Sequence, residues 1–100
     1  MSVDLASATA ETFAPHVGSR FALALTDGVL ELELLGVEAL PAAPSSPRPP
    51  FALRFRTPAV PGHLPQGTYA LAHAVLGTLE IFLVPLGADA VGMRYEAVFA

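Results

Sequence analysis

Five polar side chains are the candidates for an interaction surface: Arg54, Arg56, Gln66, Tyr69 and His73. Arg54 and Arg56 are separated by one residue, so alternation along a strand places both guanidinium groups on one face, about 7 Å apart. Two such groups can bind RNA phosphates, or they can pair with Glu31 and Glu33 on a neighbouring strand. The equal and opposite charges favour the second interpretation, a network of surface ion pairs.

The segment Gln66-Gly67-Thr68-Tyr69 offers an amide, a hydroxyl and an aromatic ring, which together can hold a ligand. A turn followed by a strand accounts for the same residues, and we expect that structural role. His73 follows on the parity of Tyr69. We expect its ring to be half buried and bonded to the backbone near a strand end, rather than to act as a metal ligand or general base.

The sequence shows no constellation for catalysis or metal binding. The three histidines, His16, His63 and His73, lack the spacing to carboxylates that is typical of a zinc site. Glu31 and Glu33 share one face of a strand, where paired carboxylates are more often solvated than catalytic. There is no GxSxG motif, no phosphate-binding glycine loop and no nucleophile paired with a base. We therefore expect no enzyme activity, no cofactor and no metal.

Length and composition indicate one domain, residues 1–100, with an apolar surface. The chain is 53% hydrophobic and only 14% charged, which favours a homo-oligomer or a protein partner. The net charge is −4, and the five basic residues are all arginines. The charge balance therefore disfavours nucleic acid as a partner, because binding to phosphates needs a basic patch.

The N-terminal residues do not resemble a secretory signal, since Asp4 stands where positive charge is needed and no apolar run follows. No stretch approaches the roughly 20 apolar residues that span a bilayer. We expect a cytoplasmic protein with no membrane association. The absence of cysteine excludes disulfides.

The first third of the chain predicts a short helix and a bent hairpin. Within the first dozen residues Ser7 or Thr9 can cap a helix that Leu5 and Phe13 anchor. From Arg20 the apolar residues alternate, and a turn at Thr26-Asp27-Gly28 joins two strands. Gly36 breaks the alternation, which indicates a bulge. Residues 41–50 contain five prolines and form a loop between strands.

The rest of the chain predicts further strands. Residues 51–56, 69–73 and 93–99 alternate, whereas residues 78–84 are apolar on both parities apart from Glu80. We therefore expect that strand to be central in the sheet or covered on both faces. The fold class is all-β, a bent antiparallel Sm-like or SH3-like barrel of five to six strands with one short N-terminal helix. The predicted core is Phe21, Leu23, Leu32, Leu53, Phe55, Leu71, Ile81, Phe82, Tyr95 and Phe99.

Small open barrels leave edge strands, and lysine, which often protects such edges, is absent here. The segments Glu80–Pro85 and Met93–Phe99 carry few charges, and we expect them to be the edges through which the protein associates with itself. The alternative is a monomer in which the N-terminal helix and the proline-rich loop lie over these edges.

One pattern covers nearly the whole chain. It runs through Phe13, His16-Val17-Gly18, Phe21, Phe51 to Phe55, Leu64, Gln66 to Tyr69, His73, Leu76-Gly77, Phe82 to Pro85 and Tyr95 to Phe99. On these residues the sequence resembles a family of small bacterial domains of unknown function. The resemblance implies a variant of the Sm-like barrel and no assigned catalytic residues.

The biochemical function therefore remains unknown from the sequence. We expect a non-catalytic protein-interaction or assembly module, and the alternative is an Sm-like RNA-binding protein.

Overall fold

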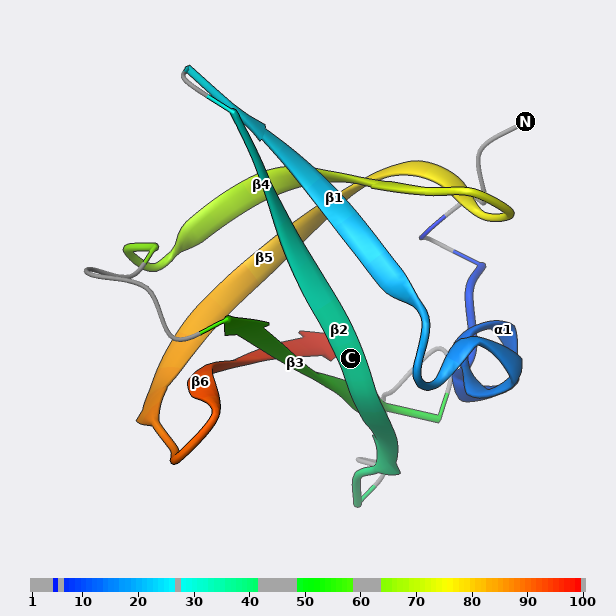
Figure 1. Ribbon diagram of the computed structural model, residues 1–100. Coiled ribbons are helices and arrows are strands. Elements are labelled where there is room, and N and C mark those ends of the chain that lie inside the picture. Colours follow the sequence, from blue (N-terminus) through cyan, green and yellow to red (C-terminus); the bar gives the residue numbers. More distant parts are fainter. Residues whose placement is uncertain (1–4, 6, 27, 42–48, 59–63, 100) are drawn as a thin grey trace.

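The computed structural model describes residues 5, 7–26, 28–41, 49–58 and 64–99. The elements are α1 (Ala10–Phe13), the 3-10 helix η1 (Ala14–His16), β1 (Arg20–Leu25), β2 (Gly28–Ala39), β3 (Phe51–Pro58), β4 (Gly67–His73), β5 (Gly77–Ala88) and β6 (Gly92–Phe99). The strands form an antiparallel barrel with the helix at one end (Figure 1). The predicted small all-β barrel with a short N-terminal helix is confirmed. Of the proline-rich loop, residues 42–48 lie outside the described residues.

The barrel is closed, with the strand order β1-β2-β3-β6-β5-β4. Closure depends on β2 and β5, which are 12 residues long and each pair with two neighbours along different halves. The C-terminal strand β6 pairs with β3 on one side and β5 on the other. The prediction of open edges is wrong for Met93–Glu96 of β6, which pairs on both sides. Gly77–Leu83 of β5 pairs with β4 alone among the described strands, so the predicted edge at Glu80–Leu83 is not contradicted.

Two bulges bend the long strands. The register between β2 and β3 shifts between Leu34 and Gly36, which confirms the bulge that the sequence predicts. A second shift lies between Pro85 and Gly87, where β5 pairs with β6. Gly87 has a φ of 124°, a conformation that side-chain-bearing residues rarely adopt.

The core fills the barrel, and the outer face of the strands meets solvent. Of the predicted core residues, Phe21, Leu23, Leu32, Leu53, Phe55, Leu71, Ile81 and Tyr95 are buried, and Phe99 is partly buried. The prediction that Phe82 belongs to the core is wrong. This residue is 49% exposed, because Ile81 and Leu83 occupy the inward positions of β5. The expectation that this strand is central in the sheet is confirmed, since β5 lies between β4 and β6. The alternative of a cover on both faces is wrong, because none of the described elements forms a second layer over it.

The helix closes one end of the barrel through Phe13. Its fully buried ring lies 5.9 Å from the rings of Phe51 and Phe99, centroid to centroid. Leu5 packs against the same core, so both predicted anchors are confirmed. Thr9 is the N-cap, and its N–H donates to Oγ1 of Thr12 at 3.0 Å. None of the described helices is long and apolar enough to cross a membrane.

Candidate functional site

The five candidate interaction residues do not come together. Arg54 and Arg56 lie on the outer face of β3, while Gln66 and Tyr69 lie just before and within the start of β4. His73 ends β4 and points inward, with 8% of its surface exposed. The sequence places these residues on elements correctly, but the barrel separates them into unrelated environments.

Arg54 bridges two carboxylates. Its Nη2 lies 2.5 Å from Oε1 of Glu38 and 2.7 Å from Oε2 of Glu96. The predicted partners, Glu31 and Glu33, are wrong for this arginine. The bulge in β2 places Arg54 opposite Gly36. Its partners are therefore Glu38, two residues beyond Gly36 on β2, and Glu96, which stands directly opposite on β6.

Arg56 stands opposite Glu33 in the register, yet its Nε pairs with Oδ2 of Asp89, in the β5–β6 turn, at 3.1 Å. The Asp89 carboxylate also accepts the backbone N–H groups of Gly92 and Val91, both at 2.8 Å. These backbone bonds, with a smaller contribution from Arg56, lower the pKa of Asp89. Both arginines are thus neutralised locally, as predicted, but by different acids.

The Gln66 to Tyr69 segment is a turn followed by a strand, as the sequence predicts. Gln66 is exposed before β4 begins. The Tyr69 ring is half buried against the core, and its hydroxyl donates to the carbonyl oxygen of Pro65 at 2.5 Å. The Tyr69 hydroxyl is therefore engaged within the turn rather than presented to a ligand.

The prediction that the His73 ring bonds to the backbone at a strand end is confirmed, but the ring is buried rather than half buried. Its Nδ1 accepts the N–H groups of Val75 and Leu76, both at 3.1 Å. The proton of the neutral ring therefore resides on Nε2, which donates to Oγ of Ser19 at 2.9 Å. The ring packs 4.5 Å from that of Phe21. Burial, and to a smaller extent the nearby His16, lowers the pKa of His73.

The described part of the chain contains no group of three or more His, Asp or Glu side chains that could hold a metal ion. His63 lies outside the described residues.

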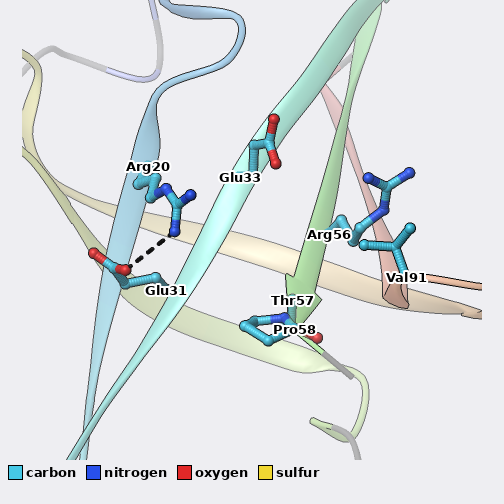
Figure 2. Close-up of a pocket in the computed structure, with 7 residues that line it drawn as sticks. All are labelled: Arg20, Glu31, Glu33, Arg56, Thr57, Pro58 and Val91. Carbon is cyan, nitrogen blue, oxygen red and sulfur yellow. Dashed lines mark hydrogen bonds and ion pairs between the residues drawn. The ribbon is translucent and has the colours of Figure 1, made fainter. Parts of the chain in front are cut away.

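A charged pocket of about 240 Å³ opens where β2 and β3 separate (Figure 2). Its lining residues are Arg20, Glu31, Glu33, Arg56, Thr57, Pro58 and Val91. Arg20 pairs with Glu31 at 3.4 Å, and Glu33 stands between Arg20 and Arg56. The Glu33 carboxylate forms no ion pair with any described residue. The volume is below that of a typical small-molecule site, roughly 300 to 1,000 Å³.

The pocket adjoins a free edge of β2. The β2–β3 ladder begins at Glu33, so the segment Gly28–Leu32 pairs with β1 alone among the described strands. The backbone groups of Leu34 point toward the β1 side. The Leu34 N–H donates to the carbonyl oxygen of Ser19 at 3.0 Å, and the Leu34 carbonyl oxygen accepts the N–H of Gly18 at 2.7 Å. Backbone groups alternate in direction along a strand, so those of Val29 and Glu31 point to the opposite, free edge.

Sequence reasoning missed this edge because it looked for edges in the C-terminal strands. The available signal is a mismatch: the β1 segment has six residues before its turn, whereas β2 continues for twelve. A strand twice as long as its hairpin partner must pair elsewhere along part of its length. Where that second pairing begins depends on the tertiary register.

Comparison with known proteins places the chain in an uncharacterised family. No curated protein and no solved structure matches it. A family model described as a domain of unknown function, DUF6916, matches residues 8–99. The match covers the helix and every described strand of the barrel, and the chain therefore belongs to this DUF6916 family of domains of unknown function.

Proposed function

We propose that the domain is a non-catalytic protein-interaction module. One observation carries the proposal: large apolar side chains on the outer surface are between 43% and 69% exposed. They are Val17, Leu25, Val29, Val75, Phe82, Leu86, Val91 and Val98. Single exposed apolar residues are ordinary, but this number on a small, charge-poor barrel is typical of a surface that another protein covers.

These side chains lie on several parts of the barrel. Leu25 and Val29 flank the tip of the β1–β2 hairpin, which projects beyond the barrel in Figure 1. Phe82 and Val98 lie on the outer faces of β5 and β6. The hairpin also carries the free β2 edge and adjoins the charged pocket, so it combines apolar, charged and backbone recognition groups.

We further propose that the protein is bacterial and cytoplasmic, and that it binds another protein or associates with itself. Self-association through Met93–Glu96 of β6 has lost its basis, because β3 and β5 pair with this segment on its two sides. Association would instead use the exposed side chains. Light scattering over a hundredfold dilution measures it, and a mass constant near that of one 10.4 kDa chain would exclude a stable oligomer.

Site-specific photo-cross-linking in the native cells tests the proposal. A photoreactive side chain replaces Val29 or Phe82, with Thr78, an exposed position on the same strand as Phe82, as the control. We expect discrete cross-linked species from at least one apolar position and none from Thr78. Enzymatic turnover that either His73→Phe or Glu31→Gln abolishes would contradict the proposal.

The rival function, an Sm-like RNA-binding protein, receives no support from the arginines. Arg54 and Arg56 are held by carboxylates, and the net charge is −4. We expect no binding to uridine-rich or adenine-rich oligonucleotides at physiological salt. A salt-sensitive gel shift that the double variant Arg54→Ala, Arg56→Ala loses would favour the rival.

A further inference from the structure

We propose that the free edge of β2, Gly28–Leu32, binds an extended, basic segment of a partner protein as an added strand. The inference rests on the proposed interaction function and specifies the site and the chemistry of the partner. Three features of the described residues support it: unpaired backbone groups, an edge without protection, and an acidic side chain without an ion pair.

The backbone groups provide the affinity. The N–H and C=O groups of Val29 and Glu31 point away from β1, and no described strand pairs with them. An extended peptide alongside this edge can form the ladder that β3 forms with the rest of β2. Strand addition of this kind supplies main-chain hydrogen bonds, and the flanking side chains supply specificity.

Within the described residues, the edge has little of the usual protection against pairing. Proteins shield such edges with lysine, proline, bulges or a covering element. Between Gly28 and Leu32 there is no lysine, no proline and no shift in the register with β1. Glu31 is the one charged residue in the segment, so it decides which partners the edge accepts.

The charges select a basic partner. Glu31 and Glu33 project on the same face of β2, beside the pocket, and Glu33 has no ion pair in the described part of the chain. Arg56, on the opposite wall, is already held by Asp89. A lysine or arginine of an added strand would therefore meet Glu33 as an available counter-ion, and the pocket has room for a side chain rather than a small-molecule ligand.

The same charges disfavour a second copy of this chain. The edge segment contains no basic residue, so pairing it with itself gives Glu31 no cationic partner from the opposing segment. It would also bring Glu31 and Glu33 of both copies onto one face, where like charges destabilise cross-strand contacts. The occupant is therefore a different, basic segment.

A synthetic probe tests the inference: a blocked seven-residue peptide of alternating lysine and valine, with a glutamate–valine peptide as its matched control. Nuclear magnetic resonance of the labelled domain locates binding. We expect the lysine peptide to shift the amides of Val29 and Glu31 and to slow their hydrogen exchange. The glutamate peptide should bind at least about tenfold more weakly, since it places like charges side by side.

Two variants separate backbone from side-chain recognition. Val29→Pro removes an N–H that faces the free edge without removing a bond to β1, so we expect it to abolish binding, while Val29→Thr retains it. Glu33→Gln should weaken binding about fivefold, the effect of one exposed ion pair. If Val29→Pro does not fold, a lysine peptide N-methylated at every residue provides the same test with the native protein, because neither edge of that peptide can donate backbone hydrogen bonds.

Equal binding of both peptides, shifts confined to other strands, or full binding by the N-methylated peptide would overturn the inference. The absence of any peptide binding would overturn it as well. These failures differ from failure of the proposed function: photo-cross-links from Phe82 without binding at β2 would leave an interaction module that uses another surface.

Discussion

Nε2 of His73 lies 2.9 Å from Oγ of Ser19, and this contact joins the end of β4 to the loop before β1. In the described residues these two strands pair at one position, Ala22 with Ala72. The Ser19 hydroxyl in turn donates to the carbonyl oxygen of His16, at 2.5 Å. A chain of hydrogen bonds therefore strengthens the weakest seam of the closed barrel.

Replacing His73 should loosen that seam. His73→Phe keeps an aromatic ring beside Phe21 but leaves the N–H groups of Val75 and Leu76 without their acceptor. We expect a loss of about 2 kcal/mol in the free energy of unfolding, because the buried N–H of Leu76 and the partly buried N–H of Val75 would lose their acceptor. Ser19→Ala should cost about 1 kcal/mol, because it removes a hydroxyl and leaves the ring in place. Urea denaturation measures both, and a His73→Phe variant as stable as the wild type would contradict this role.

The stability of the domain should fall in mild acid. The pKa of His73 is lowered from 6.5 by burial and by His16, so the unfolded chain binds a proton more readily than the folded one. The contribution of the neutral ring is complete above pH 6.5 and is lost as the pH falls through that value toward the folded pKa. Urea midpoints between pH 8 and pH 5 should decrease, and less so in His73→Phe. An equal decrease in both proteins would assign the effect to other groups.

Gly92 permits a close backbone approach between β6 and β3. A Cβ atom built on this residue would lie 1.7 Å from the carbonyl oxygen of Thr57, on the paired strand β3. Gly92→Ala must therefore displace the β3–β6 ladder, and we expect a loss of about 3 kcal/mol or more, or failure to fold. Gly36→Ala is the matched control, since a Cβ there meets nothing within 4 Å. Thermal unfolding compares them, and similar melting temperatures would contradict the prediction.

The ion pairs of Arg54 and Arg20 should contribute differently to the free energy of unfolding. Arg54 has a side chain that is 29% exposed and contacts both Glu38 and Glu96, whereas that of Arg20 is 64% exposed and contacts Glu31 alone. We expect Arg54→Ala to cost about 1 to 2 kcal/mol and Arg20→Ala less than about 0.5 kcal/mol. The difference should shrink at 1 M salt, where exposed charges are screened. Equal effects in urea denaturation would show that burial does not strengthen the Arg54 network.

The sequence was sufficient for the elements of the fold because period-two alternation is a local property. Phe21 to Leu25 and Phe51 to Phe55 reveal strands without reference to the rest of the chain. Gly36 reveals the bulge because it interrupts that alternation. Phe82 was misassigned because it is the largest apolar residue of the segment, although Thr78 and Glu80 on the same parity indicate the outward face of β5.

The candidate site could be predicted only in part. The neutralisation of the arginines follows from composition, but the choice of Asp89 as the partner of Arg56 depends on how the β5–β6 turn folds over β3. The free edge at Val29 and Glu31 depends on where β3 joins β2, which is a long-range register. Properties that rest on contacts between distant segments are not encoded in any local pattern.

Hydrogen exchange of the dilute, unliganded domain tests most directly the claim that the barrel is closed at β6 and open along the start of β2. We predict that the amide of Glu31 exchanges about tenfold or more faster than that of Leu32, which bonds toward β1. The adjacent amides of Arg94 and Tyr95 should both be protected, because β6 is paired on both sides. Protection of Glu31 equal to that of Leu32, or rapid exchange at either β6 amide, would contradict the account.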